Sequence, residues 1–65
     1  MNIKTYEYCN YVVEVHMHPI YKDFEYVIKN NDGQVVSAST HPYKFSEDAE
    51  LAAQFLIEQQ VQHLH

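Results

Sequence analysis

The chain has 65 residues, of which 46% are hydrophobic, including six tyrosines and three phenylalanines. A chain of this length predicts one domain over residues 1–65, near the lower limit at which a single core folds without a metal, disulfides or a second copy. Nine acidic residues, four lysines and no arginine give a formal net charge of -5, which disfavours nucleic acid as a partner because phosphate is bound by cationic side chains.

Cysteine content and hydropathy predict the compartment. Cys9 is the only cysteine, so no internal disulfide can form, and a reducing environment is indicated. The first residues lack the basic start and apolar core of an export signal, and no apolar run reaches the 18 or so residues of a membrane span. We therefore predict a cytoplasmic protein without a membrane anchor or a cofactor.

The first predicted strand runs from Tyr11 to His18, where apolar and polar residues alternate with the two-residue period of a strand. One face carries Tyr11, Val13, Val15 and Met17, and the other carries Val12, Glu14, His16 and His18. The same alternation continues more weakly towards the N-terminus and predicts that this strand begins near Tyr6. Pro19 then marks the connection to the next strand.

Two further strands are predicted over residues 24–29 and 35–38, joined by Asn30-Asn31-Asp32-Gly33. Register decides the type of turn, because a slip of one residue exchanges the two faces of a strand. A three-residue loop with Gly33 in the left-handed conformation places Ile28 opposite Val36 and Tyr26 opposite Ala38. This register puts Val36 and Ala38 in the core and is the one we predict.

A helix over about residues 47–60 follows, with Ser46 as its N-cap and acidic residues in its first turn. Glu50, Gln54 and Glu58 form one narrow polar stripe, and apolar residues cover more of the circumference than a three-stranded sheet needs. Two interpretations of this excess are open: a domain this small uses all of its apolar surface for its own core, or Leu51 and Phe55, at the edge of the stripe, contact a second chain. The expected fold is α+β, a three-stranded antiparallel β-meander packed against one C-terminal α-helix.

From Phe24 to the helix, the chain combines an aromatic-x-aromatic-x-Ile-Lys strand, a polar turn ending in glycine, a Val-Val pair and a serine before a helix. These features resemble the small uncharacterised YegP-like domains of bacteria. The positions that carry the resemblance are Phe24, Tyr26, Ile28, Lys29, Gly33, Val36, Ser39, Tyr43 and Ser46. The resemblance implies a β-meander packed on a helix and no established chemistry.

The same plan is similar to the arm-binding domain of tyrosine-type phage integrases, whose sheet enters the major groove of DNA. That function requires a cationic sheet face. The sheet face predicted here carries two acidic residues, two histidines and one lysine: Glu14, His16, His18, Glu25 and Lys29. We take the similarity as one of plan only.

These five residues are the first candidate binding surface. Glu14, His16 and His18 alternate on one strand, and imidazole with carboxylate suits zinc, nickel or copper. No second paired motif completes a four-ligand site, so no metal site is assigned, and a metal-binding or nucleic-acid-binding module remains the alternative function. A second hypothesis is that protonation of His16 and His18 changes an interface near pH 6.

No catalytic residues are assigned, since Cys9 has no orienting partner or glycine-rich loop in the sequence and no nucleotide or zinc-finger motif occurs. The second candidate surface is the helix edge at Leu51 and Phe55. Tyr6, Tyr8 and Tyr21 lie on the opposite parity of the strand or in a loop, so they are predicted to be exposed and to form a contact patch, since tyrosine is enriched in protein contacts. We therefore expect a non-enzymatic protein–protein binding or adaptor domain whose partner is another protein or, as a homodimer, a second copy.

Overall fold

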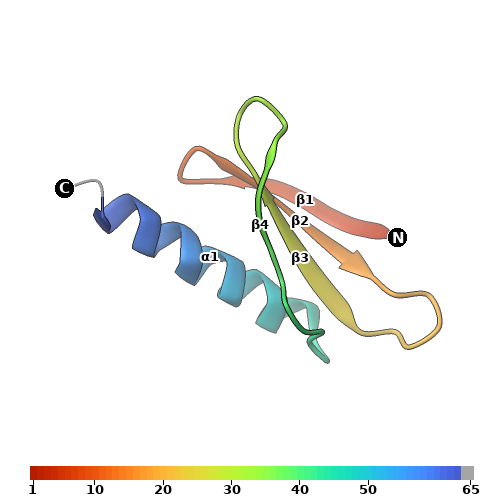
Figure 1. Ribbon diagram of the computed structural model, residues 1–65. Helices are drawn as coiled ribbons and strands as arrows, with labels where there is room; N and C mark the ends of the chain where they lie inside the picture. The colour runs from red at the N-terminus through yellow and green to blue at the C-terminus, as the bar shows by residue number, and fades with distance from the viewer. Residues whose placement is uncertain (64–65) are drawn as a thin grey trace.

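A computed structural model describes residues 1–63 as four strands followed by one helix. The strands are β1 (Asn2–Tyr8), β2 (Tyr11–Met17), β3 (Phe24–Lys29) and β4 (Val35–Ala38), and the helix is α1 (Ser46–His63). Neighbouring strands are antiparallel in the order β1-β2-β3-β4, and α1 lies across one face of the sheet (Figure 1). The α+β class and the C-terminal helix are confirmed, but the sheet has four strands rather than three.

The additional strand exists because the chain reverses at Cys9 and Asn10. Both residues have positive φ, 50° and 69°, and Tyr8 lies opposite Tyr11 across the turn. Two successive positive φ angles define the type I′ turn, whose twist matches that of a two-residue hairpin. The single first strand predicted to begin near Tyr6 is therefore wrong, because the segment forms a hairpin of two strands.

The turn between β3 and β4 has the predicted geometry. Gly33 has φ of +83°, its N–H donates to the Asn30 carbonyl, and the Asn30 N–H donates to the Gln34 carbonyl. The Asn30 side-chain oxygen also accepts from the N–H groups of Asp32 and Gln34, at 3.0 Å each. The three-residue loop with a left-handed glycine is thus confirmed.

The register beyond this turn differs from the prediction because β4 contains a bulge. Lys29 lies opposite Val35, but Ile28 lies opposite Ser37, so Val36 is an extra residue without a partner. Side chains directly opposite each other share a face, and Ser37 therefore lies on the helix side while Val36 and Ala38 are exposed. The predicted core positions of Val36 and Ala38 are wrong.

The core lies between α1 and the two central strands. Ala49, Ala53 and Ile57 follow one another at four-residue spacing, so they form a line along the helix face that packs on the sheet. The two alanines are fully buried, and their small side chains let the helix backbone approach the sheet. The buried residues from the strands are Val13, Val15, Tyr26 and Ile28.

The helix begins one residue earlier than predicted. The Phe45 carbonyl accepts from the N–H groups of Asp48 and Ala49, so Phe45 is the N-cap and Ser46 is the first helical residue. Glu47 and Asp48 still occupy the first turn, where the helix dipole favours negative charge. The helix continues to His63, three residues beyond the predicted end at Gln60.

Candidate functional site

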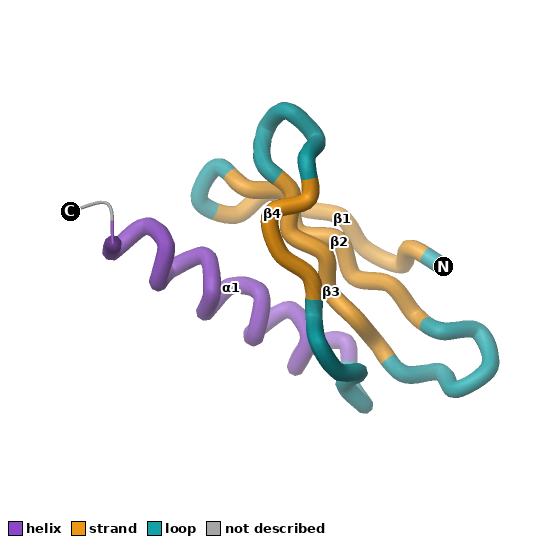
Figure 2. The backbone as a smooth tube through the Cα atoms, in the orientation of Figure 1, coloured by secondary structure: helices purple, strands orange, loops and turns teal. Residues whose placement is uncertain are grey.

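One face of the sheet is covered by α1, and within residues 1–63 no second layer covers the other (Figure 2). We call this second surface the open face. On this face Glu14 lies opposite Val27, and His16 lies opposite Glu25, in two adjacent cross-strand pairs. The alternation that predicted this surface is confirmed for β2, because Val13 and Val15 are buried on the helix side while Glu14 and His16 are only partly covered.

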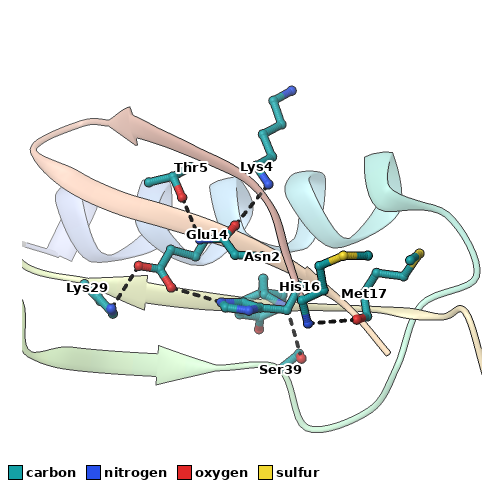
Figure 3. Close-up of polar contacts among 10 residues, drawn as sticks. Asn2, Lys4, Thr5, Glu14, His16, Met17, Lys29 and Ser39 are labelled. Atoms are coloured by element: carbon teal, nitrogen blue, oxygen red, sulfur yellow. Dashed lines mark hydrogen bonds and ion pairs between the residues drawn. The ribbon is translucent and has the colours of Figure 1, made fainter. Parts of the chain in front are cut away.

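Glu14 accepts hydrogen bonds from two polar side chains on the open face (Figure 3). Its Oε2 lies 2.9 Å from Lys29 Nζ on β3, and its Oε1 lies 2.9 Å from His16 Nε2 on its own strand. The hydrogen bond from Lys29, followed by that from His16, holds the pKa of the Glu14 carboxyl below its ordinary value. The carboxylate therefore stays ionised to a lower pH than an ordinary glutamate does, and each of its oxygens accepts a hydrogen bond.

The hydrogen bonds of Glu14 occupy part of its accepting capacity. Two of the roughly four lone-pair sites of the carboxylate accept, one from the lysine and one from the imidazole. Among residues 1–63, no group of three or more His, Cys, Asp or Glu side chains is placed to hold a metal. The cluster of Glu14, His16 and Lys29 is thus a bridge between two strands.

The other predicted residues of this surface are placed differently. His18 lies beyond the end of β2, and its Nδ1 accepts from the N–H groups of Ile20 and Tyr21 at 3.3 and 3.4 Å. Its ring lies 4.9 Å from that of Tyr21. His18 therefore organises the turn between β2 and β3. It nevertheless lines, with His16 and Glu25, a hollow of about 150 Å³ at this end of the sheet.

A polar ladder joins β1 to α1, and the sequence did not predict it. Lys4 Nζ lies 2.9 Å from Glu50 Oε1, Gln54 Nε2 donates to the Tyr6 hydroxyl at 2.9 Å, and the Tyr8 hydroxyl donates to the Glu58 carboxylate. Two residues along a strand cover nearly the same length as four residues along a helix, so all three pairs can form side by side. The predicted exposure of Tyr6 and Tyr8 is wrong, since both are half-buried against the helix, whereas Tyr21 is 76% exposed.

Leu51 and Phe55 lie on the outward face of α1, turned away from the line of Ala49, Ala53 and Ile57. They are 62% and 60% exposed, and their four-residue spacing makes them neighbours on the helix surface. The helical projection of the sequence places both residues at the edge of the polar stripe. The structure places that stripe against β1 and leaves the apolar pair uncovered within the described chain.

The remaining single residues add no further chemistry. Cys9 is exposed in the type I′ turn, and it borders a hollow of about 510 Å³ with Asn10, Asn30 and Val61.

Within residues 1–63, no helix combines the length and the apolar character needed to cross a membrane.

Comparison of the chain with protein-family models, with curated proteins and with solved structures finds no match. The resemblance to the YegP-like domains therefore stays a prediction, and the function is argued from the surfaces of the molecule alone.

Proposed function

We propose that this chain is a non-enzymatic, cytoplasmic protein-binding domain that contacts another protein through the outward face of α1. The observation that carries the proposal is the exposure of Leu51 and Phe55, 62% and 60%, side by side on the helix. A few side chains near the centre of an interface carry most of its binding free energy, and phenylalanine is among the residue types enriched there. The exposed thiol of Cys9 is compatible with a reducing compartment.

The charges around this apolar pair favour a partner different from the chain itself. Helical spacing places Glu47 and Asp48 one turn before Leu51, and Glu58 one turn after Phe55. If two α1 helices packed antiparallel about this pair, with Leu51 against Phe55, Asp48 of each would lie opposite Glu58 of the other. Like charges in such positions oppose self-association. The fitting partner has an apolar pocket bordered by lysine or arginine side chains.

The test is a pull-down with purified protein as bait from an extract of the cells that make it. The bait variants are Phe55→Ala and, as a matched control on the same helix, Gln59→Ala, because both remove an exposed side chain without changing charge. The proposal is supported if one protein is retained in stoichiometric amount by the wild type and by Gln59→Ala but lost with Phe55→Ala, and if raised salt weakens its retention. Retention that is unaffected by Phe55→Ala would overturn it.

A further inference from the structure

The two edge strands of the sheet differ in how they are protected. Natural proteins guard a free edge with charged residues, prolines or bulges, because its unpaired backbone groups can pair with another chain. The β1 edge carries Lys4 and Glu7. The β4 edge reads Val-Val-Ser-Ala, and the whole segment from Gly33 to Thr40 contains no charged residue.

The β4 edge is also apolar and accessible. Val35 and Val36 are 60% and 51% exposed, and in the described part of the chain β3 is the strand that pairs with β4. Its one protective device is the bulge at Val36, and beyond it the register continues through Ser37 and Ala38. The strand therefore offers a short stretch of ordinary backbone for pairing.

The backbone N–H and C=O of Ala38 point to the open side of β4. Ser39 donates its N–H to the Tyr26 carbonyl of β3 at 3.0 Å. Successive residues of an antiparallel strand direct their hydrogen-bonding groups to opposite sides, so the N–H and C=O of Ala38 point away from β3. Ala38 thus presents one donor and one acceptor at the open edge.

A cavity lies between this edge and the second half of the helix. It measures about 250 Å³ and is lined by Val36 and Ser37 of β4, by Leu56, Ile57 and Gln60 of α1, and by Tyr11 and Ile28. A strand added next to β4 would place its inward side chains at this cavity. The edge therefore offers side-chain space as well as backbone pairing.

We propose that β4 pairs antiparallel with β4 of a second copy of this chain, which joins the two sheets into one of eight strands. A two-fold contact brings each residue near the same segment of its copy, so charged residues at the axis would repel, and this edge has none. The acidic residues that give the chain its net charge of -5 all lie outside the segment from Gly33 to Thr40.

Pairing of this kind has a defined geometry. Antiparallel neighbours in one sheet are related by an axis perpendicular to the sheet, so both α1 helices lie on the same face. Leu56 and Gln60, which line the cavity of each copy, would then face the added strand. The contact leaves the Leu51–Phe55 pair free, and the proposal is independent of the helix-face contact proposed above.

The first experiment measures the solution mass of the full chain by light scattering over a wide range of concentration. The variant Ala38→Pro removes the outward N–H and leaves the residues that bond to β3 in place, a position that edge strands tolerate. Thr5→Pro is the matched control on the opposite edge, since Thr5 is exposed and lies opposite Glu14 in the regular part of the pairing between β1 and β2. We expect wild type and Thr5→Pro to reach twice the mass of one chain, and Ala38→Pro to stay at the mass of one chain.

A second measurement needs no variant and holds even if a proline substitution unfolds the domain. Amide hydrogen exchange of the wild type at low and high concentration should show protection of the Ala38 N–H that grows with concentration, and no change at Thr5. A monomer at every concentration would overturn the proposal. A dimer with unchanged exchange at Ala38, or one lost with Phe55→Ala but kept with Ala38→Pro, would place the contact elsewhere and overturn it as well.

Discussion

The Tyr8 hydroxyl donates a hydrogen bond to the carboxylate of Glu58, a residue 50 positions later in the chain. With the Lys4–Glu50 and Tyr6–Gln54 pairs, this contact fixes the edge strand β1 against the last helix. Helix α1 and strand β1 run in the same direction, because residue numbers rise together along the ladder. The polar stripe of the helix is therefore a contact surface of the fold.

The first prediction concerns the ionisation of Tyr8. The hydrogen bond to Glu58, with partial burial as a smaller cause, raises the pKa of Tyr8 to about 12 from an ordinary value of 10.0. A raised tyrosine pKa means that the contact stabilises the fold fully below pH 10 and is lost as the pH rises towards about 12. An NMR titration of the Tyr8 ring should show this late transition.

The matched variants for this titration both lie on α1. Glu58→Gln removes the anionic acceptor and should bring the pKa of Tyr8 back towards 10, while Glu47→Gln, in the first turn, should leave it near 12. A Tyr8 transition that is the same in both variants would show that the contact with Glu58 does not hold the phenol.

The second prediction concerns acid stability. The pKa of Glu14 is lowered, first by Lys29 and then by His16, so its contribution to stability is present above its ordinary value of 4.5 and is lost as the pH falls through the lowered value. Urea unfolding of Glu14→Gln should therefore show a smaller loss of stability between neutral and strongly acid pH than the wild type. Glu25→Gln, on the adjacent strand and exposed, should behave as the wild type does.

The third prediction concerns the core. Ile57 is 2% exposed, and its replacement by alanine removes three methyl or methylene groups from a core of seven buried residues. We expect Ile57→Ala to lower the free energy of unfolding by about 2–5 kcal/mol. For a domain whose total stability is of the order of 0.1 kcal/mol per residue, or about 6.5 kcal/mol in all, this removes roughly a third or more of the stability and should lower the urea concentration at the unfolding midpoint. Leu51→Ala, an exposed truncation on the same helix, should cost far less in the same measurement.

The fourth prediction concerns the two turns. A Cβ at Gly33 would meet no atom within 4 Å, so the cost of Gly33→Ala comes from its positive φ alone and should be about 1 kcal/mol. Asparagine tolerates this conformation better, and Gly33→Asn should cost less.

At the other turn, Asn-Gly is the preferred type I′ pair, so Cys9→Asn combined with Asn10→Gly should stabilise the domain. Destabilisation by the double variant would show that the Cys9 side chain has a packing role.

The sequence predicted those elements whose signals are local. Strands β3 and β4 lie where the alternation and the flanking turn residues placed them, and the left-handed conformation of Gly33 follows from the one residue type that adopts it freely. The hairpin at Cys9 and Asn10 escaped prediction because neither residue is a glycine. Cysteine rarely adopts the left-handed backbone conformation, so the alternation on both sides of the turn predicted a single strand.

What the sequence could not predict depends on partners distant in the chain. The bulge at Val36 cannot be read from β4 alone, because the pairing of β4 with β3 determines which residue is left without a partner. Likewise, Glu50, Gln54 and Glu58 showed a polar stripe, but nothing local indicated that β1 would supply its partners. The alternation predicted that Glu14 and His16 share one surface. The place of His18 in the turn could not be predicted, because it depends on where β2 ends.

The ladder between β1 and α1 joins residues 46 to 50 positions apart, and it has a consequence for synthesis on the ribosome. All four strands leave the exit tunnel before α1 does, so Val13, Val15, Tyr26 and Ile28 stay uncovered until α1 has emerged. A free chain without residues 46–63 exposes an apolar sheet face that it cannot cover itself. Such a chain is expected to bind chaperones, and folding of α1 onto the sheet ends this dependence.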